Sequence, residues 1–426
     1  MRRAAVVAAI FLLARAAAPG AMSFRLYGAA RTWVSSFRES LFNPGNQAVE
    51  FLGWRRGPLA SLAATAEIEA DALSLHWRLD LQGSAAQDET GAWRRELRIG
   101  QLFVQKDLSE SWVLAAGRSI QRWGTGYVFN PTDVAAPERE LGDPDNTERR
   151  AVGLDMIKLE RFSAKSSLAF CLLARMETRG RWRLTSPRLA IRFYKNVWDT
   201  DLSLVALFSR EETPVVGLNA SRVFGERLEI HGEFAVQKNS YRPYHAVLAE
   251  SRPVSGGGSF LDFRNDDGRL YVQGLLGFQY TFPGGILWVA EYYHRGQGYS
   301  LSEWRTLIVH IRGLNDEMSV PGGGPESGAA LQGILTGLAA YSPKGTLRDY
   351  LVNYLQNQGT GAVEWRIGWL LNLADLGGVW FPEFRLAFRN GFTFFLRSYI
   401  FLGRGASEFG AFPRSRILEG GLRFRL

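Results

Sequence analysis

Apolar and polar side chains alternate along most of the chain with a period of two. Between residues 73 and 81, leucines and a tryptophan occupy the odd positions, and polar residues such as His76 and Asp80 occupy the even ones. The same alternation recurs in four further stretches, at residues 188–193, 228–237, 363–372 and 418–426. A period of two is typical of β-strands whose two faces meet different surroundings. We therefore expect an all-β protein.

The connections between these stretches alternate between short and long. Tight turns containing glycine occur at residues 224–226, 283–285 and 390–391. Long segments separate them, near residues 120–149, 239–267, 298–343 and 404–414. A β-sandwich would show the same side-chain alternation, but short periplasmic turns and long extracellular loops are typical of outer-membrane barrels. We predict a transmembrane antiparallel up-and-down β-barrel of about 18 strands (range 14–18).

Composition excludes several other classes of protein. The chain has 426 residues, of which 46% are hydrophobic and 13% aromatic, so a disordered or collagen-like chain is excluded. The single cysteine, Cys171, excludes a disulfide scaffold. Beyond the N-terminus, we find no run of about 18 apolar residues suited to a spanning helix. We expect no nucleic-acid partner.

The N-terminus has the pattern of a secretory signal peptide, which we place at residues 1–21. Arg2 and Arg3 precede an apolar core at residues 4–14, and the small residues 16–18 offer a cleavage site. Cleavage would remove three arginines and lower the net charge from +8 to +5. Residues 22–426 are then expected to form one barrel in the outer membrane of a Gram-negative bacterium.

The C-terminus carries a second targeting pattern. Leu422, Phe424 and Leu426 alternate up to the chain end and resemble the signal read by the barrel-assembly machinery, although that signal usually ends in Phe. Aromatic residues near strand ends predict a girdle at the membrane interfaces: Trp112, Trp198, Tyr280, Tyr292 and Tyr399. The expected partners are therefore this machinery, outer-membrane lipid and lipopolysaccharide.

If the apolar face meets lipid, the polar face lines the lumen. Near the expected closure, most polar positions are arginines: Arg25, Arg31, Arg385, Arg389, Arg397, Arg423 and Arg425. Further pore-lining candidates are Arg78, Arg188 and Arg192, with the acids Glu229, Glu233 and Glu291 on another wall. An arginine strip would attract carboxylates or phosphates. Alternatively, these residues form cross-strand Arg–Glu pairs that only stabilise the wall.

The longest loop contains helix patterns. Residues 299–312 place Trp304, Leu307 and Ile311 on one face, and Ser300 and Glu303 have capping-box spacing. The sequence of residues 326–340 predicts a second, shorter helix. Such a loop would either fold into the lumen and narrow the pore or cover the barrel from outside, and the sequence leaves both open.

Signs of enzymatic or metal chemistry are weak. The five histidines include no HxxxH or HExxH pair, and no G-x-S-x-G elbow occurs. The acidic segment 138–148 matches no EF-hand and is typical of a solvated loop. Cys171 falls on the inward face of its strand, where a small inert residue is expected. We expect no enzyme, no metal and no cofactor.

Residues 117–133 read GRSIQRWGTGYVFNPTD. This segment resembles one in proteobacterial porin-like proteins of the alginate-export kind and related outer-membrane families, through Gly117, Arg118, Trp123, Gly124, Asn130, Pro131 and Asp133. Residues 372–410, with Asp375 and the run 407–410, are similar to these barrels too. The resemblance implies passive or facilitated export or uptake, with the closure arginines conducting an acidic polysaccharide. From the residues alone, 117–133 is a strand end and a turn.

These observations favour an outer-membrane channel that passes hydrophilic solutes or oligosaccharides by diffusion, with some preference for anions. A plugged barrel that anchors or helps to assemble surface polysaccharide is the first alternative. A barrel hydrolase with a site assembled from loops is the second.

Overall fold

The computed structural model describes residues 22–72, 75–136, 151–177, 183–209, 213–239, 268–319, 325–338, 341, 345–357, 361–388 and 390–426. Several sequence predictions lie outside the described residues: the signal peptide at 1–21, the acidic segment 138–148, Arg389, and the loop 239–267 except for Asn239.

Antiparallel strands make up nearly the whole fold. Their bounds are β1 (Met22–Phe37), β2 (Leu59–Ala72), β3 (Leu75–Gln87), β4 (Trp93–Asp107), β5 (Trp112–Ser119), β6 (Leu154–Ser163), β7 (Ser166–Glu177), β8 (Arg183–Val197), β9 (Thr200–Ser209), β10 (Val215–Phe224), β11 (Leu228–Lys238), β12 (Leu270–Thr281), β13 (Ile286–Arg295), β14 (Asp349–Asn357), β15 (Val363–Asn372), β16 (Gly378–Trp380), β17 (Glu383–Ala387), β18 (Phe392–Leu402) and β19 (Arg414–Arg425). Apart from β16 and β17, each strand pairs with its sequence neighbours, as an up-and-down barrel requires.

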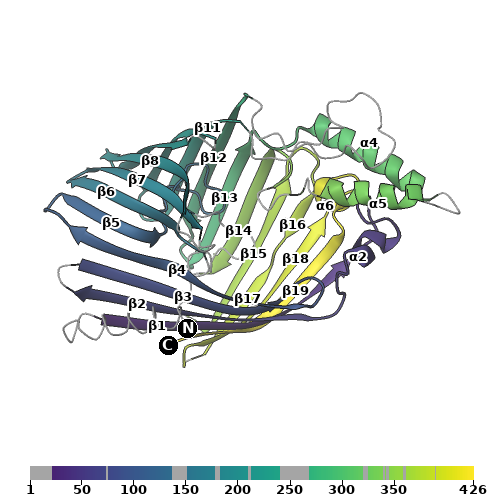
Figure 1. The fold of residues 1–426 in the computed structure, drawn as a ribbon, viewed down its shortest axis with the longest axis horizontal. Helices are drawn as coiled ribbons and strands as arrows, with labels where there is room; N and C mark the ends of the chain where they lie inside the picture. The colour runs from purple at the N-terminus through teal and green to yellow at the C-terminus, as the bar shows by residue number, and fades with distance from the viewer. Residues whose placement is uncertain are drawn as a thin grey trace.

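The sheet closes on itself, because β1 pairs with both β2 and β19 (Figure 1). Strands β16 and β17 both pair with β15 and β18, so they occupy one place in the ring and are separated only by Phe381 and Pro382. The barrel therefore has 18 strands, and the predicted fold class is confirmed. Among the described strands, closure leaves no sheet edge of the kind that an open sheet of this size would present.

Alternation along each strand separates an outer from an inner face. On β10, Val216 and Leu218 are exposed outward, whereas Val215 and Asn219 are buried inside. Exposed outward residues on other strands are similarly large and apolar, among them Ile157, Phe193 and Leu276. The inward residues are mostly polar or small. The predicted aromatic girdle is wrong for Tyr399, which lies inward and stacks against Arg397, 5.7 Å from its ring centre.

Connections differ in length between the two ends of the barrel. At the end that holds the start of β1 and the end of β19, which we call the turn end, the described connections are tight. Gly225 and Gly391 adopt φ values of +61° and +81° there, which glycine accepts at little cost. The opposite end, the loop end, carries long connections that contain helices: η1 (Pro44–Asn46), α2 (Gln47–Phe51), α4 (Leu301–Met318), α5 (Pro325–Gly337) and α6 (Glu408–Ala411).

Helices α4 and α5, which we call the helical cap, lie beyond the strand ends on one side of the barrel (Figure 1). The capping box predicted for Ser300 and Glu303 is present, and the helix runs six residues further than predicted, to Met318. Its apolar face is buried with Phe42 of the β1–β2 connection and Tyr350 of β14. In the described residues, no helix combines the length and apolar character needed to cross a membrane.

Candidate functional site

Residues 120–136, which we call the inner loop, follow β5 and run inside the barrel. Their contacts are with inward-facing side chains, which come mainly from β10, β11 and β13. The predicted entry of a loop into the lumen thus occurs, but in the segment after β5. The helical cap covers part of the rim at the loop end instead.

Glu233 on β11 is the main anchor of the inner loop. Its side chain is 4% exposed, and its two carboxylate oxygens accept hydrogen bonds from the backbone N–H groups of Thr125, Gly126 and Thr132 at 2.6–2.9 Å. The hydroxyl of Thr132 donates a further bond at 2.7 Å. Hydrogen bonds to a charged acceptor are stronger than neutral ones, so this carboxylate fixes both arms of the loop at one point.

Two further acids hold the next part of the loop. Glu291 on β13 is fully buried and accepts hydrogen bonds from the N–H groups of Tyr127 and Val128, the second at 3.0 Å. Its Oε1 also lies 3.1 Å from Nε2 of His231. The hydroxyl of Tyr127 donates to Glu229 at 2.9 Å, and burial next to that carboxylate raises the pKa of Tyr127. The three acids of the predicted acidic wall therefore face the inner loop.

The loop is also braced from within by Asp133. This carboxylate accepts hydrogen bonds from the N–H groups of Trp123 and Gly124, the second at 3.0 Å, and forms an ion pair with Arg122 at 3.1 Å. Gly124 leaves no room for a side chain, because a Cβ there would lie 2.5 Å from Oδ1 of Asn130. Four residues of the recognised motif thus meet in one turn, and Pro131 follows Asn130 directly.

The other motif residues lie outside this turn. Gly117 and Arg118 belong to the end of β5, and Arg118 forms a two-point ion pair with Asp155 of β6 at 2.7 and 2.8 Å. Register places both charges on the outer face. They therefore strengthen the wall and do not line the lumen.

The apolar side of the inner loop packs on the inner face of β6–β11. Trp123 and Ala135 are buried in a cluster with Cys171 of β7, Ala190 of β8 and Ala235 of β11. The small inward residues Ala169, Cys171, Ala190 and Ala235 of these strands leave room for the loop. Cys171 has no exposed surface in this cluster.

The closure arginines lie on a different wall. The inward arginines of β15, β17, β18, β19 and β1 form a group that we call the arginine wall. Its members are Arg366, Arg385, Arg397, Arg423, Arg425, Arg25 and Arg31. Pairing places Arg385 beside Phe395, Thr393 beside Arg423, and Tyr27 beside Arg425. These residues come from both ends of the sequence, and barrel closure brings them together.

Ion pairs neutralise part of this wall. Glu419 binds Arg397 at 2.8 Å and Arg31 at 3.3 Å, and Glu383 lies 2.9 Å from Arg385. Other acids approach it too: Glu364 lies 3.5 Å from Arg385, and Glu67 and Glu69 each lie 3.9 Å from Arg25. The structural interpretation of the arginines as cross-strand pairs therefore holds for many of them. The wall still has seven arginines to five glutamates.

Aromatic rings separate these arginines, a feature that the sequence interpretation missed. Arg397 and Arg423 lie 5.7 and 4.5 Å from the ring centre of Phe395, and Arg425 lies 5.7 Å from Tyr27. A guanidinium over an aromatic face gains a cation–π interaction and loses conformational freedom. Strand alternation in residues 393–399 contains the signal, since aromatic and arginine positions follow one another on the inward face.

The remaining arginine candidates lie elsewhere on the inner face. Arg78 on β3 is paired with Glu69 at 2.9 Å and with Asp80 at 3.0 Å. Arg188 and Arg192 project inward from β8, on the same face as the buried Ala190, and Nε of Arg192 donates to Ser203 at 3.2 Å. The structure brings neither Arg188 nor Arg192 to the arginine wall, whereas Arg78 adjoins it by sharing Glu69 with Arg25.

Glu408 ties three loop-end connections together beneath the helical cap. It accepts hydrogen bonds from the N–H of Thr346, the hydroxyl of Tyr350 and the amide of Asn372, while its own N–H donates to Asp375 at 2.6 Å. Burial raises the pKa of Glu408 and that of Asp375. The two late motif segments noted in the sequence therefore form one structural contact. Within the described part of the chain, no group of three His, Cys, Asp or Glu side chains is arranged to hold a metal ion.

Comparisons with known proteins bear on the fold. No protein-family model matches the sequence, and no curated protein matches it significantly. Several solved structures are similar: OccK11 (OpdR) of Pseudomonas aeruginosa (10% identity, TM-score 0.55), OccAB1 of Acinetobacter baumannii (8%, 0.56) and a BenF-like porin from Pseudomonas fluorescens (8%, 0.55). Each match covers 95% of this chain and 96–98% of the other. At such low identity the likeness establishes a porin-type barrel fold, and the alginate-export resemblance stays a prediction.

Proposed function

We propose that this protein is an outer-membrane channel through which small hydrophilic solutes diffuse, with a preference for anions. One observation carries the proposal: the inner loop binds the acidic wall of the lumen, whereas the arginine wall lies on other strands and has more arginines than glutamates. Glu233 and Glu291 are occupied by N–H groups of the loop. The arginine wall retains an excess of positive charge facing the lumen.

An excess of positive charge on one wall of the lumen produces a field across it. Such a field attracts anions and orients dipolar solutes, and arginines bind carboxylates or phosphates through paired N–H groups. Cation–π contacts hold Arg423 and Arg425 in place, so little conformational entropy is lost when an anion binds. This arrangement favours weak, repeated contacts along the wall.

The proposal includes location and partners. The belt of exposed apolar side chains, such as Leu276 and Phe193, suits lipid around the barrel. The similar structures include a porin. We infer a Gram-negative outer membrane, reached after removal of residues 1–21 and with the help of the barrel-assembly machinery, with lipopolysaccharide around the loop end. We propose no enzymatic activity.

Conductance in planar bilayers tests the proposal. We expect stable steps whose reversal potential in a KCl gradient shows anion preference, and a shift toward cations when Arg385, Arg397 and Arg423 are replaced by Gln. The matched control replaces three outward cations, Arg161, Lys195 and Arg222. An unchanged reversal potential in the arginine-wall variant would show that this wall is structural. Folded protein without conductance would support the plugged barrel that anchors surface polysaccharide.

A further inference from the structure

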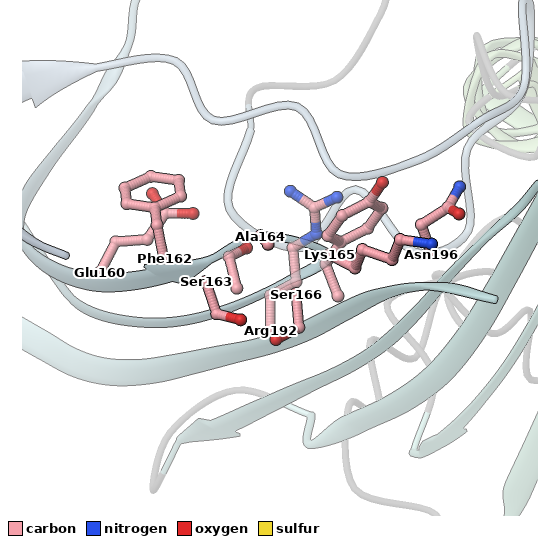
Figure 2. Close-up of a pocket in the computed structure, with 10 residues that line it drawn as sticks. Glu160, Phe162, Ser163, Ala164, Lys165, Ser166, Arg192 and Asn196 are labelled. Carbon is pink, nitrogen blue, oxygen red and sulfur yellow. The ribbon is translucent and has the colours of Figure 1, made fainter.

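A pocket of about 510 Å³ opens at the turn end, on the inner face of β6, β7 and β8 (Figure 2). The lining residues that matter for binding are Glu160, Phe162, Lys165, Arg192, Tyr194 and Asn196. These strands lie far round the ring from the arginine wall. The volume is typical of small-ligand sites, and it is larger than a single ion requires.

The charges in this pocket are divided between its two ends. Figure 2 shows Glu160 and Phe162 at one end, and Arg192, Lys165 and Asn196 toward the other. Glu160 already binds the ammonium group of Lys158 at 2.9 Å. Glu160 also lies across Ala169 from Arg192 and interacts with it electrostatically, so the acid is shared between Lys158 and Arg192.

Neighbouring groups orient Arg192 toward the pocket. Its Nε donates to Ser203 at 3.2 Å, and its guanidinium lies 5.2 Å from the ring centre of Tyr194. Among the described residues, Ser203 is the hydrogen-bond partner that the structure records for Arg192. Its terminal nitrogens point away from the strand into the hollow (Figure 2). This leaves a planar pair of donors directed at the pocket.

The groups around Arg192 complete an oxyanion site. Lys165, in the β6–β7 turn, has an exposed side chain that extends toward Asn196 along the same side of the pocket (Figure 2). Of the nearby serines, register places Ser167 on the inner face, where it is buried. The nearby acid Asp201 accepts hydrogen bonds from Tyr194 and from Asn196, the second at 2.9 Å. The two cations Arg192 and Lys165 match a doubly charged anion better than a single carboxylate.

We propose that this pocket binds a phosphate group, as inorganic phosphate or a small phosphate monoester, at the turn-end mouth of the lumen. Arg192 would hold two phosphate oxygens, and Lys165 would neutralise the second charge. Phe162 would contact the organic part of an ester. The site rests on the proposed channel function in that it would bind a solute on its way through the lumen. Phosphate binding itself does not require that the barrel conducts.

The site is tested by titrating the full-length folded protein in detergent with inorganic phosphate and measuring the affinity. A parallel titration uses acetate at equal ionic strength. We expect phosphate to bind, and Arg192→Gln and Lys165→Gln each to weaken it roughly tenfold, as loss of one charged contact would. Arg161→Gln and Lys195→Gln remove outward cations nearby and should leave binding unchanged. Arg192→Lys should keep part of it.

Two results would overturn the proposal: equal phosphate affinity in Lys165→Gln and wild type, or acetate binding as tightly as phosphate. Lys165 is an exposed turn residue, so its variant should fold even if Arg192→Gln does not. Because this titration needs no bilayer, its failure leaves the conductance result intact. A silent barrel that still binds phosphate would overturn the channel alone.

Discussion

The carboxylate of Glu233 and residue Thr132 are joined by two hydrogen bonds, from the backbone N–H at 2.9 Å and from the hydroxyl at 2.7 Å. They are 101 residues apart in the sequence, and both are almost fully buried. This contact ties the inner loop to the wall of the barrel. Its removal should therefore change the lumen more than the barrel.

We expect Glu233→Ala to release the inner loop. Each lost hydrogen bond to a charged acceptor removes about 1.5–3 kcal/mol, and the loop N–H groups lose their buried partner. In bilayers, the single-channel conductance should rise and become noisier. Glu226→Ala, in the exposed turn of the same hairpin, is the control and should conduct like wild type. Unchanged conductance in Glu233→Ala would mean that the loop does not limit flow.

Cys171 offers an independent measure of the same event. It is the only cysteine of the chain, and Trp123 and Ala135 of the inner loop belong to its buried cluster. A charged thiol reagent should react slowly with the native protein and much faster with Glu233→Ala. Mass spectrometry over time gives both rates. Fast labelling of the wild type would show that the loop leaves the wall spontaneously.

We expect Glu419→Gln to increase the anion preference of the channel. Glu419 pairs with Arg397 at 2.8 Å and with Arg31 at 3.3 Å, so the variant removes one negative charge that faces two lumen cations. The reversal potential in a KCl gradient should move toward that of chloride. Glu110→Gln removes an equal charge at an exposed turn and should not move it. A shift toward cations would contradict the assignment of this wall to the solute path.

Much of this fold follows from the sequence, because alternation reports directly on the two faces of a barrel wall. Turn and loop lengths gave the up-and-down order, and the capping box located the start of α4 at Ser300. The sequence does not show which groups the inward side chains contact. The residues around Glu233 and Glu291 do not indicate that a loop 100 residues or more away will bind these carboxylates, because alternation gives the direction of a side chain and not its contact.

The motif at residues 117–133 also shows that the sequence predicts local structure but not long-range contacts. Its glycines and Asn130-Pro131 correctly indicated a turn, and Asp133 closes that turn onto Trp123 and Gly124. That the turn lies within the barrel depends on small inward residues such as Ala190 and Ala235. These come from strands distant in the sequence, so only the folded ring reveals the space.

The helical cap should depend on one tryptophan. Trp304 is 1% exposed, and its indole N–H donates to the carbonyl of Ala406 at 2.9 Å. Trp304→Ala should cost the cap about 3–5 kcal/mol, as large-to-small changes in buried sites do. Hydrogen exchange in α4 should rise while the heat resistance of the barrel stays unchanged. Val309→Ala, on the exposed face of the same helix, should leave both unchanged.

Glu408 should make the attachment of the cap sensitive to pH. Burial raises the pKa of Glu408 above its ordinary value of 4.5, so the folded state binds a proton more tightly than the unfolded state. Its stabilising effect is therefore complete below pH 4.5 and is lost as pH rises through the folded pKa. Asp375, whose pKa burial also raises, acts in the same direction.

We therefore expect local opening around α6, measured by hydrogen exchange corrected for intrinsic rates, to become easier from pH 5 to pH 8. Glu408→Gln keeps the shape of the side chain without its charge and should flatten this dependence. Glu317→Gln, on α4 away from this contact, should not. If Glu408→Gln keeps the full pH dependence, the proton is bound elsewhere. Opening that becomes harder with rising pH would show that the donors from Thr346, Tyr350 and Asn372 outweigh the burial of the charge.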